Sequence, residues 1–182
     1  MKIQSEGGSS LRLSNKKNQI IFNPLSTPSG EVDIIALSEP KTTTELNSKK
    51  LFNLPGEFEV SGILAQGFFT DDQTNVAYKV VVEEVAVVHF GNLKEVPTSD
   101  FFEKLGENVD VIVLALNENF DDKKAKILMD KLDPRMVILI GDSTYFAAMT
   151  AKTGAKMAEE EALTLTKSGL SDDKTDVIIL NV

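Results

Sequence analysis

The sequence predicts a single α/β domain over residues 1–182, and three observations support this fold class. Short apolar segments separated by turn residues fill the first half of the chain and are typical of β-strands. In the second half, apolar segments alternate with amphipathic helical segments, which is the order of a β-α-β unit. No repeat, linker or low-complexity segment divides the chain, and its length is sufficient to bury a sizeable core.

The first half contains predicted strands joined by polar turns. Residues 10–22 indicate a hairpin that turns at residues 14–18. Residues 32–37, VDIIAL, are nearly all apolar, so we expect a strand covered on both faces. Residues 50–70 break into short strands at Pro55-Gly56 and at Ser61-Gly62. Residues 75–90 indicate a second hairpin, with its turn near Glu83-Glu84.

The second half predicts a parallel β-α-β unit. Residues 109–116 and 136–140 are apolar strand segments, and residues 121–132 between them have helical periodicity. The apolar face of that helix carries Ala125, Leu128, Met129 and Leu132. Asp121 and Asp122 suit its N-terminal end, and Pro134 lies just beyond its C-terminal end.

The final third predicts one more helix and two strands. Residues 141–154 read as a helix that is capped by Asp142 or Ser143 and ends at Gly154. Residues 162–182 read as two strands around a polar loop.

Composition excludes several function classes. The net charge of −9 is spread along the chain, so its surface repels phosphate backbones and we expect no nucleic-acid partner. The chain has no cysteine, which excludes disulfides and thiolate metal sites. The first ten residues lack a signal-peptide core, and no apolar segment approaches the roughly 20 residues that span a bilayer. We therefore predict a cytoplasmic protein without membrane partners.

Polar residues follow four of the predicted buried strands, after Leu37, Phe90, Leu116 and Ile140. Ligands of sheets with parallel strands bind beyond the carboxyl ends of those strands. If the four ends share one edge, this edge is the candidate cleft. It then contains Glu39, Lys41, Asn92, Asn117, Glu118, Asp142 and Ser143.

Several motifs occur in an order that resembles a known family. They are GGSS at residues 7–10, Asn23-Pro24, SEPKTTT at residues 38–44, PGEFE at residues 55–59 and HFGNL at residues 89–93. Pro134 before and Gly141 after the predicted strand 136–140 complete the pattern. The chain resembles the small metal-dependent hydrolases of the metallo-β-lactamase fold, in the branch related to the ascorbate-lactone hydrolases. The resemblance implies a four-layer αββα sandwich and a site for zinc or manganese.

The chain departs from that family where the family holds its metal. By resemblance, the ligand positions map to Glu39, Lys41, Thr43, Thr44, Asn92 and Gly141, and a further family histidine falls near Thr70 or Asp71. Lysine brings a positive charge, glycine has no side chain, and threonine is a weak neutral ligand, whereas zinc needs three or four N, S or O donors. Without metal, nothing lowers the pKa of a bound water to about 7.

We therefore predict a catalytically degenerate member with no catalytic residue, bound metal or cofactor. Its vestigial pocket comprises Gly8, Glu39, Lys41, Thr43, Thr44, Asp71, Asn92, Gly141 and Asp142. By elimination, we expect a binding, scaffolding or self-associating protein, whose partner is a second copy or another protein.

One enzymatic alternative remains. Glu39, Asp71 or Asp72, and Asp142 could converge on magnesium, calcium or manganese, which oxygen ligands suit. That arrangement would make the protein a lactonase or phosphodiesterase with a carboxylate-bound Mg or Mn ion. Ser143 lies at a predicted strand-to-helix turn, but the chain lacks G-x-S-x-G and helix capping explains the residue better. TTTE, at residues 42–45, likewise has the spacing of a capping box.

His89 is the only histidine of the chain. It lies in an apolar strand segment, and in the family pattern His-x-Gly-Asp the histidine precedes the ligand aspartate without being a ligand itself. We therefore expect a hydrogen-bonded core histidine rather than a catalytic group.

Overall fold

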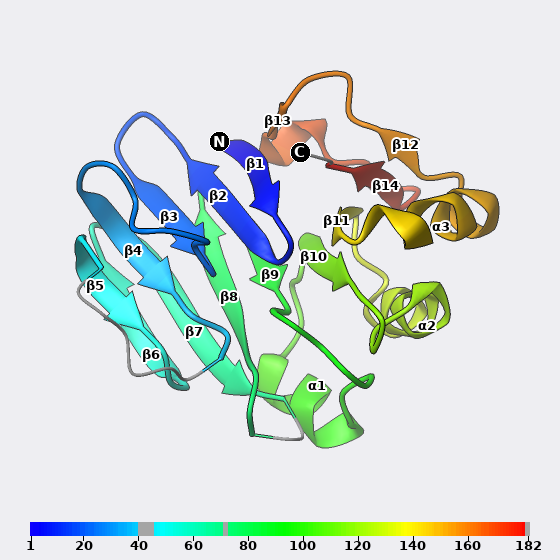
Figure 1. The fold of residues 1–182 in the computed structure, drawn as a ribbon, viewed down its shortest axis with the longest axis horizontal. Helices are drawn as coiled ribbons and strands as arrows, with labels where there is room; N and C mark the ends of the chain where they lie inside the picture. Colours follow the sequence, from blue (N-terminus) through cyan, green and yellow to red (C-terminus); the bar gives the residue numbers. More distant parts are fainter. Residues whose placement is uncertain (40–45, 71–72, 181–182) are drawn as a thin grey trace.

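Two β-sheets packed face to face form the centre of the protein in the computed structural model, which describes residues 1–39, 46–70 and 73–180 (Figure 1). Sheet A has six strands in the order β13-β1-β2-β3-β4-β5. These strands are β1 (Lys2–Gly7), β2 (Ser10–Ser14), β3 (Gln19–Phe22), β4 (Val32–Ala36), β5 (Ser48–Phe52) and β13 (Ala162–Thr164). Strands β13 to β3 pair antiparallel, and β3, β4 and β5 pair parallel.

Sheet B has eight strands in the order β12-β14-β11-β10-β9-β8-β7-β6. These strands are β6 (Gly56–Val60), β7 (Ile63–Phe69), β8 (Val76–Val82), β9 (Val85–His89), β10 (Val111–Leu116), β11 (Met136–Gly141), β12 (Lys156–Met157) and β14 (Asp176–Ile179). Strands β6 to β9 form an antiparallel meander, and β9, β10, β11, β14 and β12 are parallel. Both predicted hairpins and the predicted β-α-β unit are confirmed.

Three α-helices pack on the outer face of sheet B (Figure 1). They are α1 (Ser99–Leu105), α2 (Asp122–Leu132) and α3 (Phe146–Thr153). Asp121 caps α2 by accepting hydrogen bonds from the N–H groups of Lys123 and Lys124, as its sequence position predicts. Asp142 caps a short 3₁₀ helix, η1 (Ser143–Tyr145), that precedes α3, so the predicted helix starts later than expected.

Strand alternation divides the apolar residues of sheet A between two layers. Ile20 and Phe22 of β3 face sheet B and join the inter-sheet core. Ile21 between them faces the other way and packs with Ile35 and Leu37 in a separate cluster. The predicted capping box at residues 42–45 lies outside the described residues.

The last part of the chain contains the two predicted strands, and they belong to different sheets. β13 completes sheet A, β14 inserts into sheet B, and a second 3₁₀ helix, η2 (Lys167–Gly169), lies between them. The structure also contains α1 and β12, which the sequence pattern does not predict separately. Of the helices in the described ranges, none is both long and apolar enough to cross a membrane.

Candidate functional site

The ends of β4, β9, β10 and β11 meet at one edge of the sandwich, as predicted for the candidate cleft, and the end of β3 joins them there. A cavity of about 510 Å³ lies between Pro24, Leu25 and Leu46 on its apolar side and Glu39 and Asn92 on its polar side. A second cavity of about 360 Å³ shares Ser9 and Asn92 with the first. Its lining also includes Gly8, Asn117, Gly141 and Asp142.

The structure brings together five residues of the predicted pocket. Gly8, Asn92, Gly141 and Asp142 line the smaller cavity, and Glu39 lines the larger one. Lys41, Thr43, Thr44 and Asp71 lie outside the described residues. Glu118 and Ser143 are exposed and contribute to neither cavity.

Asn92 and Glu39 form the central polar contact of this edge. The Asn92 side-chain amide donates a hydrogen bond of 3.0 Å to Glu39 Oε1. An aspartate at residue 92 would put two carboxylates together, and these would require a cation or a proton between them. The asparagine instead supplies an N–H donor, so the two side chains can form a hydrogen bond that requires no cation between them.

Asn75 aligns the segment that carries Asn92. This buried side chain donates to the Phe90 carbonyl at 2.8 Å and accepts from the Asn92 backbone N–H at 2.9 Å. Both ends of its amide are therefore fixed by backbone groups. Sequence reasoning missed Asn75, although its position at the start of a predicted strand was a signal for such a role.

Asn23 performs a similar task for the end of β4. Its oxygen accepts from the Ser38 backbone N–H at 2.7 Å, and its amide nitrogen donates to the hydroxyls of Ser9 and Ser38. The residue adopts a left-handed conformation with φ of 47°, which asparagine tolerates better than most residues. Asn23 therefore joins the turn between β1 and β2 to the end of β4.

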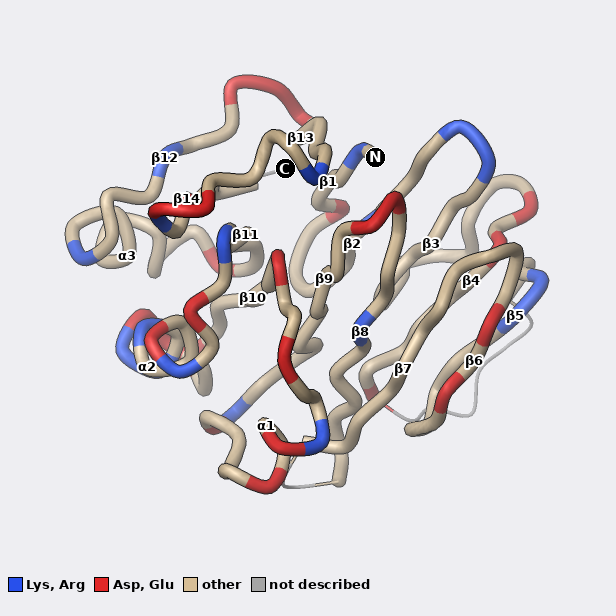
Figure 2. The backbone as a smooth tube through the Cα atoms, turned by 180° about the vertical axis from the view of Figure 1, so that it is seen from behind, with Lys and Arg blue, Asp and Glu red and all other residues tan. Residues whose placement is uncertain are grey.

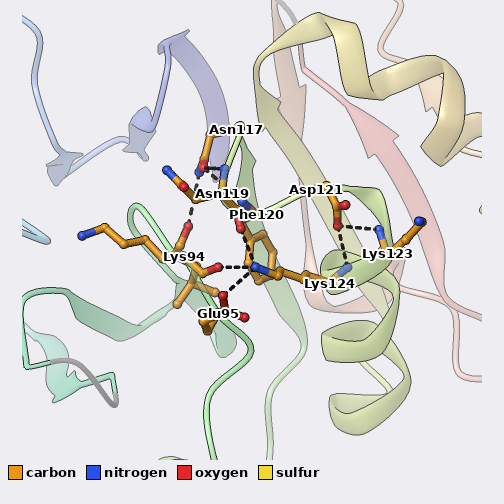
Figure 3. Close-up of polar contacts among 9 residues, drawn as sticks. Lys94, Glu95, Asn117, Asn119, Phe120, Asp121, Lys123 and Lys124 are labelled. Atoms are coloured by element: carbon orange, nitrogen blue, oxygen red, sulfur yellow. Dashed lines mark hydrogen bonds and ion pairs between the residues drawn. The ribbon is translucent and has the colours of Figure 1, made fainter.

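Asn117 forms hydrogen bonds through both ends of its side-chain amide, and two of them lie within the loop between β10 and α2 (Figure 3). Its oxygen accepts from the N–H groups of Asn119 and Phe120, and its nitrogen donates to the Leu93 and Ala115 carbonyls. Because these bonds use its whole amide group, Asn117 is a structural residue of the cleft edge.

Lys124 ties that loop to the segment after Asn92. Figure 3 shows its ammonium between the Lys94 carbonyl, the Glu95 carboxylate and the Asn119 carbonyl, each at 2.8 Å from Nζ. This cation therefore holds the backbone beside the smaller cavity rather than facing into it.

Gly141 can carry no side chain in this backbone. It ends β11 with φ of +100°, and a Cβ there would lie 2.3 Å from the Leu116 carbonyl oxygen. The histidine that the family pattern places here would therefore meet fixed backbone rather than a movable side chain. Gly91 is similarly confined, since its Cβ would lie 2.3 Å from Ser38 Oγ.

His89 lies beneath this edge and is fully buried. Its Nε2 donates to the Ser9 carbonyl at 3.0 Å, which requires that Nδ1 accept from the Gly91 N–H at 3.1 Å. Burial lowers the pKa of His89 to about 4, although the bond to Ser9 opposes this shift. Both ring nitrogens thus bind backbone, as expected of a core histidine.

The described residues do not fit the zinc or manganese site that the family resemblance implies. Among residues 1–39, 46–70 and 73–180, no three His, Cys, Asp or Glu side chains lie close enough to hold a metal ion. Glu39 accepts from Asn92, and Asp142 caps η1 by accepting from the Thr144 N–H at 2.9 Å. The capping bond to Thr144 lowers the pKa of Asp142.

Two face-to-face sheets, helices outside and a cleft at the strand ends define an α/β sandwich of the metallo-β-lactamase type. Residues 2–140 match the family described as the beta-lactamase superfamily domain. The chain therefore belongs to the metallo-β-lactamase superfamily, and the predicted fold class is confirmed. No curated protein has a sequence that matches this chain.

Solved structures of hydrolase-like proteins share this fold. A candidate Zn-dependent hydrolase of the metallo-β-lactamase superfamily from Thermotoga maritima superposes with a TM-score of 0.84 and 21% identity, covering 100% of this chain and 98% of its own. A candidate metal-dependent hydrolase from Parabacteroides distasonis has a TM-score of 0.66 and 14% identity, covering 98% and 91%. The metallo hydrolase Igni18 from Ignicoccus hospitalis has a TM-score of 0.62 and 14% identity, covering 98% and 95%.

Proposed function

We propose that this protein is a non-enzymatic member of its superfamily, which binds a small polar ligand at the strand ends without a catalytic metal. The hydrogen bond from the Asn92 amide to the Glu39 carboxylate carries this proposal. At the place where a cation would need oxygen ligands, the chain presents an amide N–H to its own carboxylate. The degenerate pocket predicted from the sequence supports the same lack of a catalytic metal. A binding, scaffolding or self-associating role is the broader form of this proposal.

The reaction chemistry of metal-dependent hydrolases supports this choice. Such enzymes depend on a metal ion that lowers the pKa of a bound water to about 7. His89 cannot take over as a general base, because both of its nitrogens bind backbone groups and it is fully buried. Ser143 has no described imidazole beside it, since the single histidine lies in the core.

The cavity residues also favour a ligand that donates hydrogen bonds. Asn92 uses its amide nitrogen on Glu39, and no described residue donates to the Asn92 side-chain oxygen. That oxygen, the Ser9 hydroxyl and apolar contacts from Leu25 and Leu46 meet at the 510 Å³ cavity. A small amine or polyol with an apolar side suits this lining.

A second form of a non-enzymatic role is the binding of another copy of the chain or another protein, as the sequence analysis expects. Analytical ultracentrifugation at rising protein concentration tests self-association directly.

We also propose a cytoplasmic location, which the lack of cysteine supports.

The decisive experiment is calorimetric titration of the protein with zinc, manganese and magnesium. The protein must carry no histidine tag, because a tag would itself bind zinc. We expect no stoichiometric binding of any of these ions and no hydrolysis of lactone or phosphodiester substrates. One equivalent of tightly bound manganese or magnesium, lost in Glu39→Gln, would overturn the proposal in favour of a carboxylate-held hydrolase site.

A further inference from the structure

A third cavity lies at the opposite end of the sandwich from the candidate site. Its volume is about 860 Å³, within the roughly 300–1,000 Å³ of small-molecule sites. Strand β8 connects the two places, since Asn75 precedes it at the candidate site and Val82 ends it at this cavity. At about 3.3 Å per residue, β8 separates them by roughly 20 Å. We call this space the distal cavity.

The inner wall of the distal cavity is apolar. Met1, Ile63 and Val82 line it, and each belongs to the core between the two sheets. Their exposed fractions are 8%, 2% and 3%, so the cavity ends on the packed interior rather than on a polar surface. An apolar group that enters it would exchange water for these side chains.

The rim of the distal cavity is positively charged. Lys2, Lys16 and Lys17 line it and are exposed, and no described carboxylate lies within ion-pair distance of any of them. The single lining carboxylate, Glu83, accepts from the Met1 ammonium at 2.6 Å. Figure 2 shows the lysines of the β2–β3 turn at this end of the molecule. Glu83 also interacts electrostatically with Lys16, so three lysines and the Met1 ammonium face one lining carboxylate and make this rim locally positive in a chain of net charge −9.

The turns around the rim hold a fixed shape. The Asn18 amide of sheet A donates to the Ser61 carbonyl of sheet B at 2.9 Å, so a hydrogen bond joins the two sheets at the mouth. Ser61, Glu83 and Glu84 all have φ between 51° and 65°. Glutamates are unusual in such left-handed turns, where glycine and asparagine are preferred, and strain of this kind is often found at functional sites.

We infer that the distal cavity binds a single-chain anionic amphiphile, with its acid group among Lys2, Lys16 and Lys17 and its apolar chain against Ile63 and Val82. An acidic head pairs with the exposed ammonium groups, and an apolar tail leaves water to lie against the apolar wall between the sheets. This site shares no lining residue with the candidate site. The inference is therefore independent of the proposed function.

The test uses decanoate as the probe, titrated below its micelle range and followed by amide chemical shifts. We expect saturable shifts confined to the turns at residues 14–18, 61–63 and 81–83. Decyltrimethylammonium has the same chain with a cationic head, and decanol has it with a neutral head, so both are expected to bind more weakly.

Charge-reversed variants distinguish an effect of the rim lysines on binding from an effect of the protein's net charge. Lys16→Glu/Lys17→Glu is expected to weaken decanoate binding about tenfold, equivalent to about 1.4 kcal/mol. Lys50→Glu/Lys156→Glu makes the same change in net charge at exposed lysines outside the cavity and is expected to bind like the wild type.

Three outcomes would overturn the inference. They are the absence of saturable shifts in those turns, equal weakening in the two double variants, and equal binding of the cationic amphiphile. If Lys16→Glu/Lys17→Glu fails to fold, the wild type decides the question, because binding at a charged rim must weaken as sodium chloride is added.

Discussion

The His89 ring lies flat on the Phe22 ring, with centroids 4.7 Å apart and an angle of 4° between the planes. Phe22 ends β3 of sheet A, and His89 ends β9 of sheet B. The stacked pair therefore joins the two sheets directly beneath the candidate site. The His89 bond to the Ser9 carbonyl attaches the β1–β2 turn to the same point.

This environment predicts a dependence of stability on pH that arises from one residue. Burial lowers the His89 pKa from 6.5 to about 4, so the folded protein keeps the ring neutral. Between these values the unfolded chain takes up a proton that the folded chain does not. The free energy of unfolding should therefore fall as pH drops from about 6.5 to about 4, by about 3 kcal/mol in total.

Urea unfolding at pH 7.5, 6.5, 5.5 and 5.0 measures this slope above the range in which most carboxylates titrate. His89→Asn lacks the titrating group and should show a much flatter profile. The imidazole resonance of this single-histidine protein provides a direct check. A His89 resonance that titrates between pH 6 and 7 would contradict the expectation.

Asn92→Asp should destabilise the protein and create a cation requirement. The change replaces the donor 3.0 Å from Glu39 with a second carboxylate. We expect a loss of about 1–3 kcal/mol at pH 7.5 and low salt, because two carboxylates cannot both ionise cheaply at this distance. Thermal unfolding with and without magnesium or manganese measures the loss and its recovery.

Two variants control for the carboxylate pair. Glu39→Gln/Asn92→Asp restores one charge and a donor, so its stability should return toward that of the wild type without added metal. Asn92→Ala removes the donor alone and should respond to neither ion. Equal stability of Asn92→Asp and the wild type would show that the pair is not a close contact.

Gly141→Ala should cost more stability than Gly154→Ala. Both glycines have positive φ, which costs a residue with a Cβ about 1–2 kcal/mol. The Cβ at Gly141 additionally meets the Leu116 carbonyl at 2.3 Å, whereas nothing lies within 4 Å of a Cβ at Gly154. We expect an excess of about 2 kcal/mol in urea unfolding. Similar losses for the two variants would mean that the end of β11 adjusts freely.

Gly141→His tests whether the family ligand can be restored. The larger side chain retains the same Cβ clash, so we expect it to destabilise at least as much as Gly141→Ala and to gain no zinc affinity. Unfolding and zinc titration of this variant are the measurements, and a stable zinc-binding variant would contradict the prediction.

Asp110→Asn should weaken the contact between η2 and sheet B. Asp110 accepts from the Ala86 N–H at 2.9 Å and from the Lys167 ammonium at 2.7 Å. Burial alone would raise the Asp110 pKa, but Lys167 and the Ala86 N–H together lower it below 3.8. Its contribution is therefore present at pH 7 and lost as pH falls below about 3.8.

We expect Asp110→Asn to lose about 1–3 kcal/mol in urea unfolding at pH 7. The matched control is Asp100→Asn, because Asp100 pairs with Lys104 on the exposed surface and should change stability by about 0–1 kcal/mol. Equal effects of the two variants would show that the Asp110 contacts contribute little.

The fold was largely predictable because periodicity records local burial. The apolar segment 32–37 was expected to be covered on both faces, and β4 is buried at every position. Asp121 marks the start of α2 because its side chain can cap N–H groups, and Gly154 marks the end of α3 because glycine tolerates a left-handed conformation. These signals are local, so they need no knowledge of the partner strand.

Pairing across the chain was less predictable. Nothing local distinguishes β13, which pairs with β1, from β14, which inserts beside β11. α1 is short, and only Phe101 and Leu105 of its seven residues are buried, so its apolar face leaves a weak pattern.

The sequence predicts where the candidate site lies, but it does not predict the hydrogen bonds that position the residues of the site. Strand-end reasoning located Glu39, Asn92, Asn117 and Asp142 at one edge, whereas Glu118 and Ser143 from the same prediction line neither cavity. The roles of Asn75 and Asn23 depend on backbone groups far away in sequence, and no residue pattern reveals such partners.

The insertion of β14 between β11 and β12, and the pairing of β13 with β1, affect how the chain reaches its native state. The hydrogen-bond ladders of both sheets are complete only when residues 156–179 have been synthesised and have paired. Closing β1 against β13 joins residues more than 150 positions apart, which makes the contact order high and the search slow. During synthesis on the ribosome, β1 and β11 therefore expose unpaired edges, and we expect chaperones to recognise this protein at that stage.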